Sequence, residues 1–141
     1  MDLMEARRRI MFMSKYKSKN LYNAATDTEN AFWRANSPLG ELVTNRSGYR
    51  ASDFIRVRPN TTYTINYNSL SNATAAGMVF WNDNFGNYPV GGVALYYQRE
   101  GGGAYTFTTP ANCQYVTIST FPGSNNVQLE LGQHATPYKP Y

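Results

Sequence analysis

Short stretches of alternating apolar and polar residues recur about every ten residues along most of this chain, and turn-forming residues separate them. In the clearest stretch, 62–68, Tyr63, Ile65 and Tyr67 share one face, and threonines and asparagines share the other. The stretch 77–82 is mostly apolar, which indicates burial on both faces or the wall of a groove. The expected strands are 41–45, 53–57, 62–68, 77–82, 93–98, 104–109, 114–120 and 126–131.

Turn residues fall between these strands, at 59–60, 82–84, 91–92, 101–103 and 122–125. No stretch with a helical period is long enough to form a helix among these strands. The pattern predicts an all-β fold, an antiparallel jelly-roll β-sandwich of about eight strands. Before it lies an opening region, 20–52, where we expect a short turn or helix at 26–33 and a turn at 37–40.

The C-terminal stretch is expected to be one last strand followed by an extended tail. Apolar and polar side chains alternate over 126–131, and Gly132 ends the strand. Two prolines then stiffen a tail that carries Tyr138 and Tyr141.

The net charge of +4 belongs to the first residues of the chain. Residues 1–19 hold six basic and two acidic side chains, whereas seven of each follow from residue 20 onward. We therefore divide the chain into a basic N-terminal docking arm, 1–19, and a neutral β-sandwich domain, 20–141. Because a nucleic-acid-binding domain carries its positive charge on a folded face, we expect no nucleic-acid partner. No apolar run of membrane-spanning length occurs either.

The arm has the pattern of a short amphipathic helix. Asp2 and Glu5 have the spacing of a capping box. Such a helix is marginal alone in water, so we expect it to order only against a partner surface. A frayed basic tail and a membrane anchor are the competing interpretations. The residues expected to dock the arm are Leu3, Ala6, Arg7, Arg8, Arg9, Ile10 and Met13.

The inventory of reactive side chains argues against an enzyme. Cys113 and His134 are the only residues of their types, and His134 lies in the tail. Asp83 and Glu100 could pair as the acid and base of a glycosidase, but nothing in the sequence brings them together. No metal-binding motif or nucleophile elbow occurs. We therefore expect a non-catalytic protein without a cofactor.

Four stretches resemble small β-sandwich domains, similar to carbohydrate-binding modules, that recur in phage tail, baseplate and fibre proteins. These are 52–64, 80–84, 107–116 and the terminal Q-L-E-x-G-x-x-A-T-x-Y-x-P-Y at 128–141. Asn60 stands where the first stretch usually has glycine, and asparagine tolerates the left-handed conformation. The leader L-M-E-A-R-R-R-I is similar to N-terminal arms of gut-phage virion proteins. Related sandwiches often hold calcium, and Asn126 and Glu130 could help to bind it, but one acidic residue is too few to predict a metal site.

The resemblance implies a non-catalytic protein on the surface of a tailed-phage virion, made in the cytoplasm of the host bacterium. Its partners would be other capsid or tail proteins, host or mucosal glycans, and further copies of the chain in a trimer. Sugars bind through aromatic faces and a few oriented polar groups, although most aromatic residues of a sandwich pack its core. The residues expected to bind carbohydrate are Trp81, Asn82, Asp83, Asn84, Tyr88, Tyr96, Tyr97 and Arg99. The competing hypothesis is a capsid decoration or head-fibre protein that binds no sugar.

Overall fold

The computed structural model describes residues 2–4, 19–67, 76–95, 104–120 and 126–141. Within these residues the fold is all-β, with eleven strands and one short 3-10 turn, η1 (Ala24–Thr26). In every strand pair of the described residues the two strands run antiparallel. The expected all-β, antiparallel architecture is therefore confirmed, with more and shorter strands than the sequence predicts.

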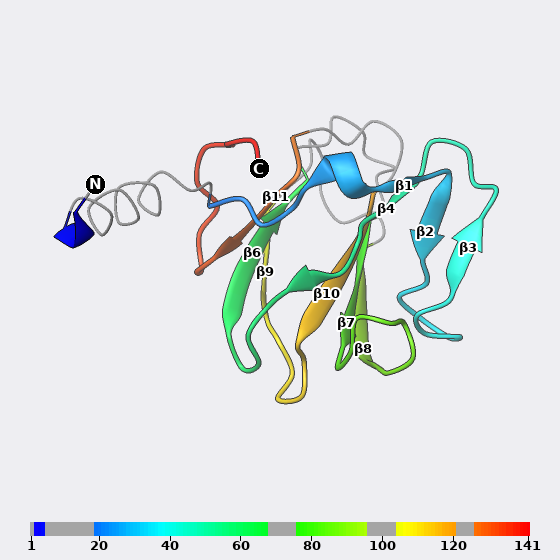
Figure 1. The fold of residues 1–141 in the computed structure, drawn as a ribbon. Coiled ribbons are helices and arrows are strands. Elements are labelled where there is room, and N and C mark those ends of the chain that lie inside the picture. Colours follow the sequence, from blue (N-terminus) through cyan, green and yellow to red (C-terminus); the bar gives the residue numbers. More distant parts are fainter. Residues whose placement is uncertain (1, 5–18, 68–75, 96–103, 121–125) are drawn as a thin grey trace.

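The largest sheet has six strands and is built around β10 (Tyr115–Thr120) and β7 (Ala76–Trp81). Its strands follow the order β1-β4-β10-β7-β8, and β5 pairs with β10 beside β4 (Figure 1). The remaining bounds are β1 (Thr28–Glu29), β4 (Arg50–Ala51), β5 (Ile55–Arg56) and β8 (Pro89–Leu95).

Two smaller sheets complete the architecture. The three-stranded sheet has the order β11-β6-β9 and consists of β11 (Gln128–Leu131), β6 (Thr62–Asn66) and β9 (Ala104–Thr108). A hairpin of β2 (Ala31–Trp33) and β3 (Leu42–Thr44) forms the two-stranded sheet. Strand β2 lies against β10, so the hairpin packs beside the largest sheet.

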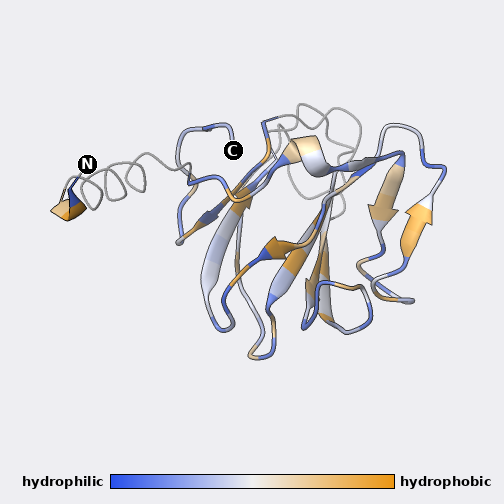
Figure 2. Cartoon of the chain, in the orientation of Figure 1, coloured by the Kyte–Doolittle hydropathy of each residue, from blue (hydrophilic) through white to orange (hydrophobic). Residues whose placement is uncertain are grey.

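The six-stranded and three-stranded sheets share one apolar core. Ile65 and Leu129 from the smaller sheet are fully buried, as are Met78, Val116 and Ile118 from the larger one. Figure 2 shows that the loops between the strands are mostly hydrophilic. The expected inward face of β6 is confirmed, because Tyr63, Ile65 and Tyr67 are all buried in this core.

Two expectations about the chain path are wrong. The sequence predicts a short turn or helix at 26–33, but this region holds β1 and β2, which follow η1. The predicted turn at 91–92 lies inside β8. Gly92 is needed there because a Cβ atom would come within 2.6 Å of the carbonyl oxygen of Ala35. The glycines therefore let another segment approach the strand closely.

Two residues with a left-handed backbone conformation lie at strand boundaries that the sequence predicts. Asn60 has a φ of 51°, and Gly132 has a φ of 113° immediately after β11. Both conformations are accessible to these residue types and costly for most others. The turn before β6 and the end of β11 are thus specified locally by the sequence.

The C-terminal tail packs back over β11. The carboxamide of Gln128 accepts a hydrogen bond from the Lys139 amide at 2.8 Å and donates to the Thr136 carbonyl at 3.1 Å. The Glu130 carboxylate accepts hydrogen bonds from the Thr136 hydroxyl at 2.6 Å and the Gln128 amide at 2.7 Å. Gln128 and Glu130 are consequently buried, although their alternation with apolar residues predicts an exposed polar face.

Candidate functional site

The loop that joins β7 to β8 (residues 82–88) is held in one shape by its own hydrogen bonds. The Asp83 carboxylate accepts hydrogen bonds from the amides of Asn87 and Tyr88, both at 3.2 Å. The amide of Asn82 donates to the Tyr88 carbonyl at 2.9 Å, which closes the base of the loop. Asp83 therefore fixes the loop from within and does not act as a free surface charge.

This loop presents two aromatic side chains to solvent. Phe85 is 79% exposed and Tyr88 is 66% exposed. Both are apolar surfaces that the fold does not bury, and they lie on a loop whose backbone is already ordered. Large aromatic side chains in such positions are typical of recognition surfaces.

A hollow of about 490 Å³ adjoins Tyr88, and we call it the loop hollow. Three asparagine carboxamides, one tyrosine and two apolar residues line it, and Asn112 comes from the turn between β9 and β10. Among the described lining residues none carries a charge. The lining residues are Asn82, Asn87, Tyr88, Pro89, Val90 and Asn112.

Four of the eight residues predicted to bind carbohydrate belong to this loop. Asn82 and Tyr88 line the hollow, Asp83 holds the loop, and Asn84 is exposed beside Phe85. Tyr96, Tyr97 and Arg99 lie outside the described residues. The set of residues predicted to bind carbohydrate leaves out Phe85 and Asn87, which the composition of the loop could have indicated. It also leaves out Asn112, for which the local pattern gives no signal.

Trp81 has a different role from the one predicted. Its side chain is fully buried, and its indole Nε1 donates to the Thr117 hydroxyl at 2.9 Å. The rings of Trp33 and Phe54 pack edge-on against it, with centroids 5.5 and 5.3 Å away. Because no face of the indole reaches solvent, the prediction that Trp81 stacks on a sugar does not hold. Trp81 is buried because both faces of β7 are buried: Met78 and Val79, which point to opposite faces, are fully buried as well.

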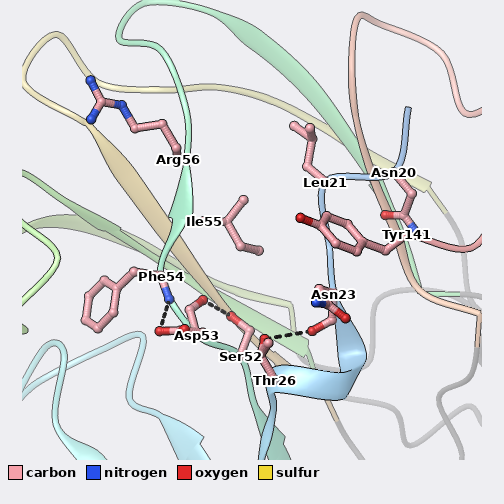
Figure 3. A pocket seen from close by; sticks show the side chains of 10 residues that line it. All are labelled: Asn20, Leu21, Asn23, Thr26, Ser52, Asp53, Phe54, Ile55, Arg56 and Tyr141. Carbon is pink, nitrogen blue, oxygen red and sulfur yellow. Dashed lines mark hydrogen bonds between the residues drawn. The ribbon is translucent and has the colours of Figure 1, made fainter. Parts of the chain in front are cut away.

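A second hollow, of about 290 Å³, lies between the start of the domain and the segment around β5. Figure 3 shows Leu21, Ile55 and Tyr141 around this space. One polar side chain that lines this hollow already makes a hydrogen bond within the domain: the Asp53 carboxylate accepts from the Phe54 amide at 2.8 Å. This hollow has one exposed aromatic residue, Tyr141, whereas the β7–β8 loop has two.

Several ionisable groups of the described residues form structural contacts. Burial raises the pKa of the Asp27 carboxyl, although the Tyr22 hydroxyl and the Arg50 guanidinium act to lower it. The Arg50 Nε lies 3.3 Å from the Asp27 carboxylate, and the pair ties β4 to the residue before β1. Burial also raises the pKa of the Cys113 thiol. Glu100, considered as a partner of Asp83, lies outside the described residues.

The described residues contain no group of three or more metal-ligating side chains. Both carboxylate oxygens of Glu130 already accept hydrogen bonds from Thr136, and one also accepts from Gln128. Because both oxygens already accept hydrogen bonds, the geometry does not favour calcium binding by Glu130. Within the same residues, no helix has the length and apolar character to cross a membrane.

Most of the arm lies outside the described residues, including Ala6, Arg7, Arg8, Arg9, Ile10 and Met13 among those expected to dock it. Of that set, Leu3 is described and is 67% exposed. Where the chain joins the domain, the Lys19 ammonium donates to the Thr136 hydroxyl. Figure 1 shows this junction beside β11, away from the loop between β7 and β8.

The loop hollow is thus the candidate site: the exposed Tyr88 and three asparagine carboxamides line it, and Phe85 is exposed on the same loop. These carboxamides can both donate and accept hydrogen bonds. Comparison of the chain with protein-family models, curated proteins and solved structures found no match.

Proposed function

We propose that the protein is a non-catalytic surface protein of a tailed-phage virion that binds host or mucosal glycans. In this proposal the two larger sheets form a jelly-roll sandwich, which displays the loop hollow. The arm at 1–19 docks the protein on the capsid or tail. The virion context rests on the resemblance of four sequence stretches to phage domains. The binding activity rests on the geometry of the β7–β8 loop.

One observation carries the binding proposal: Phe85 and Tyr88 are exposed on a loop that Asp83 holds rigid. Aromatic faces pack against the C–H surface of sugar rings, and carboxamides can donate to and accept from sugar hydroxyls. Asn82, Asn87 and Asn112 supply three such carboxamides around Tyr88. A loop that is ordered before binding loses less conformational entropy when a ligand arrives.

The size of the site favours weak binding by each copy. A hollow of about 490 Å³ that is open to solvent accommodates one or two sugar rings. Many copies on one virion would raise the overall avidity without any new contact. Because phage fibres and decorations are usually symmetric, the proposed assembly is a trimer in which the arm and the domain contact neighbouring copies.

A glycan array tests the binding proposal directly. The wild-type domain is expected to bind a subset of the glycans, and Tyr88→Ala and Phe85→Ala are expected to lose that binding. Tyr138→Ala is the matched control, because Tyr138 is exposed on the tail and does not line the loop hollow. Circular dichroism should show that all three variants remain folded.

The alternative is a purely structural decoration protein that binds no sugar. One observation favours it: Leu42 and Leu131 are also exposed, at 39% and 60%, and could form contacts between subunits. In this alternative Phe85 and Tyr88 are buried against a neighbouring copy. A folded wild-type domain that binds no glycan, together with dissociation of the assembly by Phe85→Lys, would support it and remove the adhesion proposal.

A further inference from the structure

A separate hollow of about 410 Å³ lies between β5 and β11, and we call it the arginine hollow. Arg56 and Arg58 are among its lining residues, and both are exposed. Leu21 and Leu131 give it an apolar wall. It shares no described lining residue with the loop hollow.

The backbone of Arg58 is held on both sides. Its amide donates to the Tyr63 hydroxyl at 2.9 Å, and its carbonyl accepts from the Thr109 hydroxyl. Pro59 and the left-handed Asn60 follow at once, so the turn after Arg58 has little freedom. The guanidinium therefore extends from a fixed point of the fold.

Arg56 is positioned by an aromatic neighbour. Its guanidinium carbon lies 5.4 Å from the centroid of the Tyr115 ring, and its Nη1 donates to the Tyr115 hydroxyl at 3.2 Å. A guanidinium has five N–H donors, so this contact leaves donors for a ligand. Two arginines that line one hollow, two residues apart in the chain, can bind an anionic oxygen pair.

The polar groups of the wall suit a hydroxylated ligand. Tyr63 is only 4% exposed, yet it lines the arginine hollow. Its hydroxyl accepts from Arg58, and no described residue accepts its proton. The exposed Gln114 adds a carboxamide. Among the described lining residues none carries a carboxylate, so nothing there neutralises the two arginines.

We infer that the arginine hollow binds a carboxylated sugar, with the carboxylate on Arg56 and Arg58 and the ring against Leu21 and Leu131. This inference rests on the proposed function, because it assigns a second ligand class to the same glycan-binding domain. The volume of about 410 Å³ matches a single acidic sugar ring. The Tyr63 hydroxyl and the Gln114 carboxamide then bind the ring hydroxyls.

The two hollows flank one turn. The turn between β9 and β10 contributes Asn112 to the loop hollow and Gln114 to the arginine hollow. Because these residues are two apart, their Cα atoms are within about 7 Å. One acidic oligosaccharide can therefore reach both hollows, which bind it as two linked subsites.

The test titrates the full chain with a sialic-acid-terminated oligosaccharide, a glucuronic-acid-terminated oligosaccharide and the neutral counterpart of each. We expect at least one acidic probe to bind more tightly than its neutral counterpart. Arg58→Gln should lower that affinity roughly tenfold, since it removes a hydrogen-bonding charge. Arg46→Gln removes the same charge from an exposed site between β3 and β4 and should leave the affinity unchanged. Raising the salt concentration should weaken the acidic probe selectively.

The outcomes separate this inference from the proposed function. Equal affinity of Arg58→Gln and wild type for the acidic probes would overturn the arginine site, even if Tyr88→Ala abolished binding of neutral glycans. Loss of acidic binding in Arg58→Gln but not in Arg46→Gln supports the arginine site, even if Tyr88→Ala has no effect. Absence of binding to both acidic probes would overturn the arginine site, whereas the adhesion proposal is overturned by a glycan array on which the folded wild type binds nothing. Tyr63→Phe keeps the ring and should also weaken the acidic probe.

Discussion

The side chain of Asn20 donates a hydrogen bond to the carbonyl of Lys139 at 3.1 Å, which joins the start of the domain to the C-terminal tail. The same carboxamide donates to the Val127 carbonyl at 3.1 Å and accepts from the Leu129 amide at 3.1 Å. Leu21 adds a backbone hydrogen bond to Leu129 at 2.8 Å. The segment thereby covers the outer edge of β11, an edge that would otherwise be open to pairing with another chain.

Substitution of Asn20 tests this junction. Asn20→Ala leaves buried backbone groups of Val127 and Leu129 without their partner and should lower the free energy of unfolding by about 3 kcal/mol. Urea denaturation measures the change. Asn36→Ala, at an exposed position, is the control and should stay within about 0.5 kcal/mol of wild type. Equal stability of the two variants would contradict the assigned role.

The Glu130 carboxyl predicts a pH dependence of stability. Burial acts to raise its pKa, but hydrogen bonds from Thr136 and Gln128 outweigh burial and hold this pKa below the ordinary value of 4.5. A carboxyl whose pKa is lower in the folded state stabilises the fold above its unfolded pKa. That stabilisation should be lost as the pH falls from 4.5 through the folded-state pKa.

Glu130→Gln removes this titration. Urea denaturation from pH 7 to pH 3 should therefore show a smaller loss of stability in the variant than in wild type. The raised pKa of Asp27 works in the opposite direction, because protonation of that carboxyl favours the folded state. Comparison of wild type with the variant cancels the contribution of Asp27. Parallel curves for the two proteins would contradict the role of Glu130.

Trp81 is predicted to matter for stability. Trp81→Ala removes a fully buried indole and should cost about 4 kcal/mol of unfolding free energy. Thr117→Val leaves the indole N–H without an acceptor and should cost about 2 kcal/mol. Thermal denaturation measures both. Tyr88→Ala, which truncates an exposed ring, should change stability by less than about 0.5 kcal/mol.

The segment that contains Ala35 lies close to Gly92 of β8, and this contact can be tested by substitution. Gly92→Ala would bring a Cβ atom within 2.6 Å of the Ala35 carbonyl oxygen. We expect the resulting strain to lower the stability by about 2 kcal/mol. In Gly91→Ala the nearest atom is a Phe80 ring carbon at 3.4 Å, so this neighbouring variant should be tolerated. Equal effects of the two substitutions would argue against the close approach of Ala35 to Gly92.

Local sequence patterns predict the strands well and the burial of individual side chains less well. Tyr63, Ile65 and Tyr67 alternate with polar residues, and all three face the core. Gln128 and Glu130 follow the same alternation, yet the tail buries them. The tail packs on β11 through hydrogen bonds of Thr136 and its neighbours, and the sequence of the strand alone does not predict these contacts. A period of two specifies which residues share a face, but distant segments decide whether that face meets solvent.

At the candidate site, too, the local sequence predicts the turn but not which side chains are buried. The sequence predicts a turn at 82–84, and in the structure this turn is part of a longer loop, 82–88. The position of Trp81 at the end of a strand suggested exposure, but Trp33 and Phe54 cover it. Asn112 reaches the loop hollow from another turn, which follows from the antiparallel pairing of β7 with β10 and from no local motif.

The central claim is that the loop hollow binds glycans through Tyr88, and calorimetric titration of the strongest neutral array glycan tests it most directly. The account predicts that Tyr88→Ala weakens binding about tenfold or more, through loss of the aromatic face and its buried contact area. Tyr138→Ala should bind as wild type does. Equal affinities of wild type, Tyr88→Ala and Tyr138→Ala for that glycan would contradict the claim.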